Sequence, residues 1–326
     1  MRPWAALAGL VPLVAAAAAL AQTDPGAWSN GPRLPVARSE VSVAAIGSTI
    51  YVAGGYAAAG PHPTALDTTG KVDVDEPLVE AFDTVAGTWR EVAPLPRGLN
   101  HVGLAALNGK LYAFGGFQKQ NRDPVADANV YDPATNRWTA LPPLGRPRGS
   151  IGVVAFDGKL HLVGGRDEHS LIIHEVFDPA NARYSAAAPL PVGRDHLGLV
   201  AVAGAIYAIA GRIDDFNHNT SYVDRYDPVA DVWSAMAPMP SERSGMAVAV
   251  YHGRILAIGG ERGGGTFTNN EAYDPQTNTW STLTPLPEGR HGTGAVVIGE
   301  RLYIPAGGPV NGGSRQSDTL LIFTQR

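Results

Sequence analysis

The chain has no cysteine among its 326 residues, and this absence limits its chemistry. Without cysteine there is no disulfide, no thiolate nucleophile and no lipid-acylated cysteine at a processed N-terminus. The sequence also has no long run of basic residues, and its formal net charge is −5. We therefore expect no nucleic-acid partner and no anionic-membrane partner.

Helical patterns and common nucleophile motifs are missing as well. Beyond the N-terminus no segment keeps the 3.6-residue periodicity of a helix, and Gly-x-Ser-x-Gly does not occur. Glycines 263–265 precede no helical pattern, so they do not predict a phosphate cradle. The 39 glycines and 26 prolines follow no collagen period, which suits an all-β chain with many tight turns.

The first 21 residues have the features of a secretory signal peptide. Arg2 supplies a positive charge, residues 4–20 are apolar, and Ala19, Leu20 and Ala21 fit the small-x-small cleavage pattern. An uncleaved signal anchor is the alternative, but Pro12 and the polar residues 22–24 favour cleavage after Ala21. We expect a secreted or periplasmic protein without stable membrane insertion, divided into a signal peptide (1–21) and one domain (22–326).

An internal repeat organises the rest of the chain. Six apolar strand patterns each end in two small residues, which permit positive φ and close backbone approach. These endings are Gly54-Gly55, Gly115-Gly116, Gly164-Gly165, Ala210-Gly211, Gly259-Gly260 and Gly307-Gly308. Downstream of most endings, an aromatic-Asp turn leads to a second aromatic residue. The second aromatics are Trp28, Trp89, Trp138, Tyr184, Trp233 and Trp280, at intervals of 46 to 61 residues. Such intervals fit four short strands, which is the size of one propeller blade.

The two ends of the sequence complement one another. The last repeat includes the strand pattern of residues 319–323 but stops at Arg326 without a tryptophan strand. The missing strand pattern, residues 27–30 around Trp28, stands near the N-terminus. Joining these segments in one sheet would close a ring without unpaired edges. We therefore predict an all-β fold, a six-bladed β-propeller whose N-terminal fourth strand joins three C-terminal strands.

These repeats resemble the kelch family. The resemblance rests on the paired glycines, the Tyr-Asp-Pro turns, the spaced tryptophans and the connectors such as Pro189-Leu190-Pro191, followed by Arg194. It covers nearly all of residues 22–326 and implies the propeller architecture. It does not by itself imply an activity, because function depends on the site carried by a fold.

Antiparallel order places the start of each first strand beside the end of each second strand. We call this side of the ring the funnel face, and we expect ligands there. Candidate ligand-binding residues are Arg38, Glu40, His101, Arg148, Arg166, Arg194, His196, Arg212, Arg243, Glu261, Arg290 and His291. Asp195 is a further candidate because, like these histidines and acids, it occupies a position at which the other repeats have different residues. No residue is assigned a catalytic role from sequence alone.

Some of these candidates have a structural alternative. Arginine recurs at one position in five repeats (38, 148, 194, 243 and 290), so these residues could instead cap strand ends by pairing with carbonyls or acids. The non-repeated residues are more informative, because a ligand site is asymmetric. The long insertion 56–77 could be a lid or disordered. The oxygen-rich segment 214–219 matches calcium loops poorly, and no metal site is predicted.

Two functions remain open at this stage. The first is a cofactor-free, monomeric binding module for a glycan, a sugar acid, a peptide or a protein. The second is a periplasmic mutarotase or epimerase for a sugar acid such as sialic acid, which the resemblance implies because one exported kelch group has that activity. Such an isomerase needs only a general acid and a general base near the anomeric oxygen. The resemblance also extends to galactose oxidase, but its Tyr–Cys cofactor requires a cysteine that this chain lacks.

Overall fold

The computed structural model describes residue 1 and residues 24–58, 73–119 and 121–325. Residues 2–21 of the predicted signal peptide and residues 59–72 of the long insertion lie outside these ranges. In the described ranges the regular elements are strands, and no helix there is long and apolar enough to cross a membrane. The all-β prediction is confirmed.

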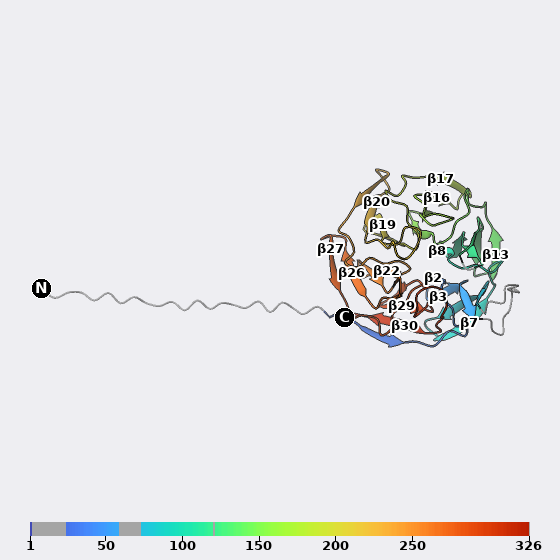
Figure 1. Ribbon diagram of the computed structural model, residues 1–326. Helices are drawn as coiled ribbons and strands as arrows, with labels where there is room; N and C mark the ends of the chain where they lie inside the picture. The colour runs from blue at the N-terminus through green and yellow to red at the C-terminus, as the bar shows by residue number, and fades with distance from the viewer. Residues whose placement is uncertain (2–23, 59–72, 120, 326) are drawn as a thin grey trace.

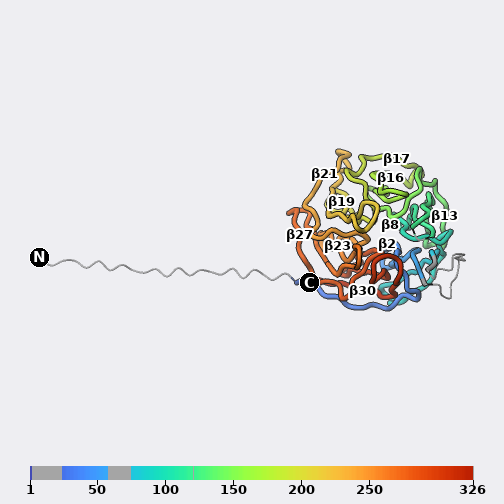
Figure 2. Tube along the Cα trace, viewed as in Figure 1, coloured from blue at the N-terminus to red at the C-terminus, as the bar shows by residue number. Residues whose placement is uncertain are grey.

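Six four-stranded antiparallel sheets stand around a central axis, as predicted (Figure 1). From the innermost strand outward, the first three blades are β2 (Ser42–Ile46), β3 (Thr49–Ala53), β6 (Val79–Asp83), β7 (Thr88–Val92); β8 (Gly103–Leu107), β9 (Lys110–Phe114), β12 (Ala128–Asp132), β13 (Arg137–Ala140); and β14 (Gly152–Phe156), β15 (Lys159–Val163), β16 (His174–Asp178), β17 (Arg183–Ala186). The other three are β18 (Gly198–Val202), β19 (Ala205–Ile209), β20 (Val223–Asp227), β21 (Val232–Ala235); β22 (Ala247–Tyr251), β23 (Arg254–Ile258), β26 (Asn270–Asp274), β27 (Thr279–Thr282); and β28 (Val296–Ile298), β29 (Arg301–Pro305), β30 (Leu320–Thr324), β1 (Ala27–Asn30). The tube in Figure 2 follows the chain once around the ring from blue to red.

The N-terminal strand closes the ring. β1 pairs antiparallel with β30, with Trp28 opposite Phe323 and their ring centroids 4.9 Å apart. Figure 1 shows the blue N-terminal strand outside the red strands of the sixth blade. Around the axis each innermost strand contacts the next, and β28 contacts both β22 and β2. The predicted closure is confirmed.

Six apolar clusters lie between neighbouring blades, and each contains one of the repeated aromatics. The ring nitrogen or hydroxyl of that aromatic donates to a carbonyl of the preceding connector. For example, Trp138 Nε1 donates to Ala93 O at 2.9 Å and Trp280 Nε1 to Ala237 O at 3.0 Å. An aromatic ring with a polar edge suits this place, since the ring fills the interface and the edge satisfies a connector carbonyl. The repeated aromatics therefore pack between neighbouring blades.

The paired small residues join each blade to the next one. The N–H of the second residue donates to the carbonyl that ends the next connector, as Gly116 does to Arg148 O at 3.0 Å. A Cβ on Gly115 would stand 2.1 Å from the same carbonyl, so this approach requires glycine. In the sixth repeat the pair is Ala306 and Gly307, both with positive φ. The assignment to Gly307 and Gly308 was wrong by one residue, because Pro305 occupies the last strand position.

Three small hairpins extend the funnel face from the ends of second strands. They are β4 (Tyr56–Ala58) with β5 (Asp73–Asp75), β10 (Phe117–Gln118) with β11 (Asp123–Pro124), and β24 (Glu261–Arg262) with β25 (Gly265–Thr266). They raise the wall around the axis on that side of the ring.

Two buried histidines in blade 3 form a neutral pair. His161 Nδ1 donates to His174 Nε2 at 2.9 Å, and His174 Nδ1 donates to Ala188 O at 3.1 Å. Burial and the charge of His174 lower the pKa of His161 from 6.5 to about 4, and burial lowers the pKa of His174. The unfolded chain therefore binds protons first as the pH falls below 6.5, so stability decreases between pH 6.5 and about 4.

We expect His161→Gln to weaken this acid sensitivity. The glutamine amide can still donate to His174, but it does not titrate. Between pH 7 and pH 5 the wild type should lose about 1–2 kcal/mol more unfolding free energy than the variant. Urea unfolding at both pH values measures this difference, with His252→Gln on an exposed turn as the control. An equal loss in His161→Gln and wild type would contradict the assignment.

Candidate functional site

Each repeat presents three positions to the funnel face. The connector ends in a residue that forms an isolated bridge with the residue after the small pair. The residue that follows this bridge position lies shortly before the inner strand and is the third of these positions. The bridges are Ser39–Tyr56, Asn100–Phe117, Gly149–Arg166, Asp195–Arg212, Ser244–Glu261 and His291–Gly308. The fold thus repeats the same backbone six times, and only the side chains differ between blades.

The residue that follows each bridge position has a left-handed backbone in all six repeats. These residues are Glu40, His101, Ser150, His196, Gly245 and Gly292, with φ between 52° and 63°. This conformation is costly for residues other than glycine, and such positions cluster at functional sites. Glycine is present where space is short, since a Cβ on Gly292 would lie 2.6 Å from Glu40 Oε2. Glycine in blade 6 therefore makes room for the carboxylate of blade 1.

A cavity of about 300 Å³ opens on the funnel face above this ring of residues. It is lined by Glu40, Tyr56, His101, Asn121, His196, Arg212, Phe216, Glu261, Gly312, Gly313 and Ser314. A smaller cavity of about 120 Å³ continues along the axis between the inner strands, past Val102, Ile151 and Leu197. The charged and imidazole groups thus form a floor between the open pocket and a narrower channel lined by both polar and apolar residues.

Glu40 lies between two histidines at this floor. His101 Nε2 is 2.8 Å from Glu40 Oε2, and His291 Nδ1 is 3.3 Å from Glu40 Oε1. His101 Nδ1 also contacts Asn100 Oδ1 at 2.5 Å, so both nitrogens of this ring face acceptors. Burial alone would raise the pKa of Glu40, but His101 and His291 outweigh burial and hold that pKa below its ordinary value. Glu40 is therefore ionised although it is only 5% exposed.

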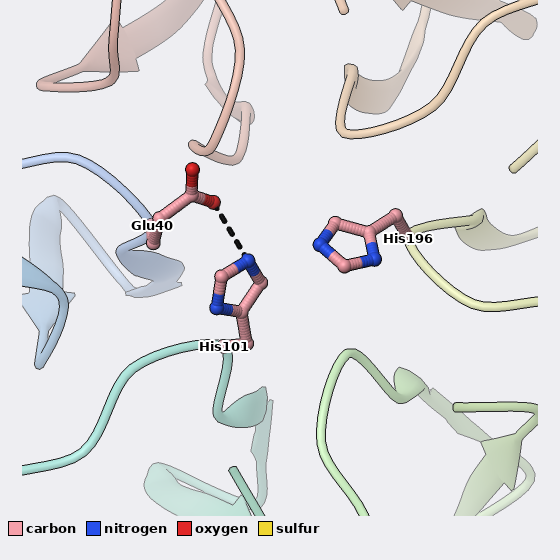
Figure 3. Close-up of side chains that lie close together, drawn as sticks. All are labelled: Glu40, His101 and His196. Atoms are coloured by element: carbon pink, nitrogen blue, oxygen red, sulfur yellow. Dashed lines mark ion pairs between the residues drawn. The ribbon is translucent and has the colours of Figure 1, made fainter. Parts of the chain in front are cut away.

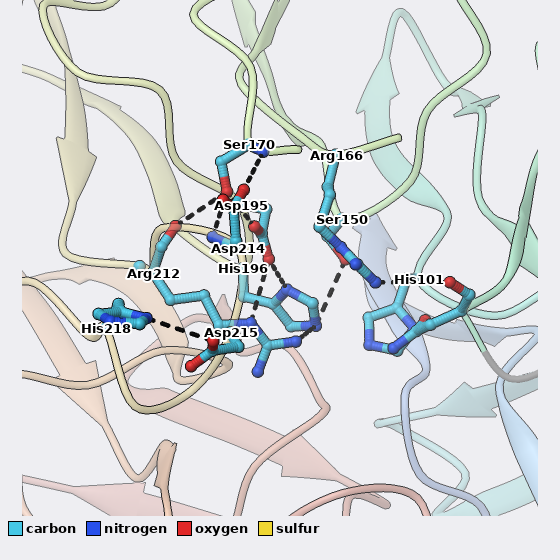
Figure 4. Close-up of polar contacts among 12 residues, drawn as sticks. His101, Ser150, Arg166, Ser170, Asp195, His196, Arg212, Asp214, Asp215 and His218 are labelled. Atoms are coloured by element: carbon cyan, nitrogen blue, oxygen red, sulfur yellow. Dashed lines mark hydrogen bonds and ion pairs between the residues drawn. The ribbon is translucent and has the colours of Figure 1, made fainter. Parts of the chain in front are cut away.

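A second group of charges forms the opposite wall (Figure 4). Arg212 donates to Asp195 at 3.1 Å, to Glu261 at 2.8 Å and to His196 Nε2 at 2.9 Å. Asp195 also contacts His196 Nδ1 and the Ser170 hydroxyl. Burial and then Arg212 lower the pKa of His196 to about 4, so this imidazole is neutral at pH 7. Asp195 fixes its tautomer, with the Nε2 lone pair facing the pocket.

Arg166 has unused hydrogen-bond donors near the pocket. Its Nη2 has one long contact, 3.4 Å to Asn121 O, and its buried Nε has no hydrogen-bond partner. The guanidinium stands 5.3 Å from the Phe117 ring centroid, and that ring lies 6.0 Å from the His101 ring. Figure 4 shows Arg166 extending from its strand end toward His101 and His196. The unused donors suit an anionic group at this edge of the pocket.

The structure gathers about half of the predicted ligand-binding residues at one place. Glu40, His101, His196, Arg212 and Glu261 line the cavity. His291 lies directly behind Glu40 and Glu261, and Arg166 lies at the edge. The five repeated arginines are not among the lining residues.

The surroundings of those five arginines fit the alternative role, in which they cap strand ends by pairing with carbonyls or acids. Each is at most 3% exposed and donates to backbone carbonyls near the end of its blade's second strand or nearby in the connector. In four blades the guanidinium also pairs with an acid at the second position of the third strand. These pairs are Arg38–Glu80, Arg148–Glu175, Arg194–Asp224 and Arg243–Glu271, whereas Arg290 bonds to Thr319 instead. We therefore leave Arg38, Arg148, Arg194, Arg243 and Arg290 out of the site.

Several pocket residues were not predicted from the sequence. Tyr56 and Phe216 follow the ends of second strands in blades 1 and 4, and the segment 312–314 comes from the last loop. Gly312 N donates to Glu261 Oε2 at 2.9 Å, which brings this loop over the axis. Tyr56 directly follows a small pair, so its place in the repeat would have predicted it to lie at the pocket. No sequence pattern predicts that Phe216 and the segment 312–314 reach the pocket, because their positions depend on loop conformation. Segment 214–219 contributes Phe216 to the pocket, with its ring 5.8 Å from the Arg212 guanidinium.

The fold and the polar pocket together define a kelch-repeat propeller with a funnel-face site. A family model described as NANM, N-acetylneuraminate epimerase, matches residues 31–271. The chain belongs to this N-acetylneuraminate epimerase family of kelch-type propellers.

Curated relatives match shorter parts of the chain. The N-acetylneuraminate epimerase of Haemophilus influenzae (strain PittEE) is 35% identical over 106 residues, covering 31% of this chain and 24% of that protein. Kelch-like protein terF of Aspergillus terreus is 32% identical over 117 residues, covering 33% of this chain and 24% of that protein. The matches thus span about a quarter of these relatives' lengths. The solved structure of YjhT superposes with a TM-score of 0.73 at 18% identity, covering 89% of this chain and 96% of that one, which supports the fold.

Proposed function

We propose that this protein is a mutarotase that opens and closes the ring of a carboxylated sugar of the sialic acid class. The observation that carries the proposal is the buried set of acid and base groups around one cavity of about 300 Å³. That volume lies in the range of small-molecule sites. Membership of the N-acetylneuraminate epimerase family supports the substrate class.

Ring opening needs one group that takes the proton of the anomeric hydroxyl and one that protonates the ring oxygen. The His101 ring faces acceptors at both nitrogens, so a proton on either nitrogen has a partner and the ring can act as the acid. Glu40 stabilises that imidazolium and orients it. His196 is neutral, held by Asp195, and its Nε2 accepts a proton once Arg212 turns to the substrate. The two imidazoles are close enough to act on one anomeric centre, with centroids 4.6 Å apart.

Arg166 is the proposed partner of the substrate carboxylate. We expect Arg166→Gln to weaken binding of a carboxylated sugar by about tenfold or more, because a charge-assisted hydrogen bond contributes about 1.5–3 kcal/mol. KM should rise more than kcat falls, since the arginine does not contact the reacting oxygens. Arg262→Gln, an exposed arginine 5.1 Å from the Phe267 ring, is the matched control. Equal KM values in both variants would contradict this role.

The activity is tested by proton NMR of freshly dissolved N-acetylneuraminic acid. The protein should speed the approach to anomeric equilibrium above the buffer rate, and heat-denatured protein should not. No acceleration for this sugar, other sugar acids or common hexoses would refute the mutarotase. If the sugars then still bound at the pocket, the protein would be a glycan-binding module, which is the second candidate because the chain also resembles proteins named only as kelch-like. We further propose that the protein is exported by the N-terminal signal, which mass analysis of the mature N-terminus would test.

A further inference from the structure

Three side chains at the pocket floor converge on one point. One nitrogen or oxygen atom from each of Glu40, His101 and His196 lies within 4.8 Å of the other two. Figure 3 shows His101 turned toward the Glu40 carboxylate and His196 facing both from across the axis. The three residues come from blades 1, 2 and 4, each at the left-handed position that opens an inner strand.

The outer nitrogen of each imidazole is held by an oxygen. His101 Nδ1 contacts Asn100 Oδ1 at 2.5 Å, and His196 Nδ1 contacts Asp195 Oδ1. The orientation of the Asn100 amide is fixed, because its nitrogen donates to Asp75 at 2.7 Å and to Phe117 O at 3.0 Å. Both rings therefore direct Nε2 toward the axis. Metal-ligating histidines are oriented in this way, with the second nitrogen bonded to a carboxylate or carbonyl oxygen.

Acceptors exceed donors at this point. His291 donates its Nε2 proton to Val310 O at 2.7 Å, which turns its buried Nδ1 toward Glu40 and Glu261. Three carboxylates, Asp195, Glu40 and Glu261, are each at most 5% exposed. Arg212 pairs with Asp195 and Glu261, whereas the partners of Glu40 are imidazoles. Such a cluster needs further positive charge, either as protons on the imidazoles or as a metal ion.

We propose that Glu40, His101 and His196 form a binding site for a divalent first-row transition metal such as Zn²⁺, open toward the cavity. Two imidazoles and one carboxylate favour Zn²⁺, Co²⁺ or Ni²⁺ over Mg²⁺ and Ca²⁺, which prefer oxygen ligands. The ion replaces the proton between His101 and Glu40 and supplies the missing charge. Arg212 gives up its contact with His196 and keeps those with Asp195 and Glu261. The metal site shares Glu40, His101 and His196 with the proposed isomerase, so a bound ion would take the place of the acid and base described above, but the binding itself needs no sugar.

The test uses the full mature protein without a histidine tag, stripped with a chelator and titrated with Co²⁺ in the absence of sugar. We expect one Co²⁺ per chain, visible d–d absorption bands, a micromolar or tighter Kd, and displacement by Zn²⁺. X-ray absorption of the Co²⁺ form should show imidazole scattering from two ligands. Binding of less than half an equivalent, or a spectrum of aqueous Co²⁺, would overturn the proposal even if every variant failed to fold.

Variants then locate the site. Glu40→Gln and His196→Gln remove a ligand and should each weaken Co²⁺ binding by about tenfold or more. Asn100→Ala removes the oxygen that orients His101 and should weaken Co²⁺ binding by about tenfold. His252→Gln is the matched control, since His252 and Glu300 form an exposed pair at the same 2.8 Å separation, and His252 follows the end of β22 opposite to the funnel face. Circular dichroism confirms that each variant is folded. Equal affinities in Glu40→Gln, His196→Gln and His252→Gln would assign the binding to another place and refute the site.

Discussion

Replacing Glu40 by glutamine is expected to slow the catalysed interconversion of anomers by about a hundredfold or more. Glutamine keeps the size of the side chain and can still accept from His101, so the change removes the charge without opening a cavity. The His101 imidazolium then loses the carboxylate 2.8 Å from its Nε2 and no longer holds its proton in place. The rate loss should appear in kcat, because Glu40 acts on the reacting proton rather than on the sugar carboxylate.

The control for this prediction is Glu300→Gln. Glu300 lies 2.8 Å from His252 on an exposed turn. The Glu300→Gln variant therefore removes a carboxylate–imidazole pair of the same length outside the site. Proton NMR of anomeric exchange gives the rates, and thermal unfolding shows whether both variants remain folded. A Glu40→Gln protein with at least half of the wild-type rate would exclude Glu40 from the reaction.

Removing one buried arginine is expected to have the largest effect on stability. Arg38→Leu should lower the free energy of unfolding by about 3–5 kcal/mol, because it leaves Glu80 buried without its cation. Burial lowers the pKa of Arg38 and raises that of Glu80 despite their contact at 2.7 Å, so the attraction does not fully repay desolvation. The loss should therefore come mainly from the unpaired carboxylate.

Blade 2 provides the matched double variant. It has Leu99 and Asn129 at the two positions, and both are buried. Arg38→Leu/Glu80→Asn copies that pair and should recover at least half of the stability lost in Arg38→Leu, since replacing both members of a buried pair is far cheaper than removing one. Urea unfolding of the three proteins measures these values. A single variant that loses less than about 1 kcal/mol would show that this arginine does not hold its blade together.

The architecture was predictable because the same local sequence features recur in the successive repeats, so a weak signal in one repeat is supported by the others. The spaced tryptophans, the small residue pairs and the complementary chain ends each depend on local backbone rules, and together they determined blade number and closure. The misplacement of the last pair at Gly307 and Gly308 has a local cause. Three small residues follow Pro305, and the sequence alone does not show which two of them adopt positive φ.

The site was predictable only in part, because repetition identifies a position but not its burial. Arg38 and Arg166 both begin as arginines near the funnel face, yet Arg38 is inside its blade and Arg166 has unused donors beside the pocket. A charge-pair pattern in the sequence could have separated them: Glu80, Glu175, Asp224 and Glu271 occupy one strand position, opposite four of the five repeated arginines. Loop residues such as Phe216 reach the cavity through conformations that no periodic pattern encodes.

The location of a bound sugar acid tests the account most directly. A crystal structure with the methyl glycoside of N-acetylneuraminic acid, whose ring cannot open, would show the ligand without turnover. We expect its carboxylate within hydrogen-bonding distance of Arg166 and its anomeric carbon on the pocket side of His101 and His196, next to both rings. A glycoside bound at the opposite face of the ring, or bound here with its carboxylate turned away from every arginine, would contradict it.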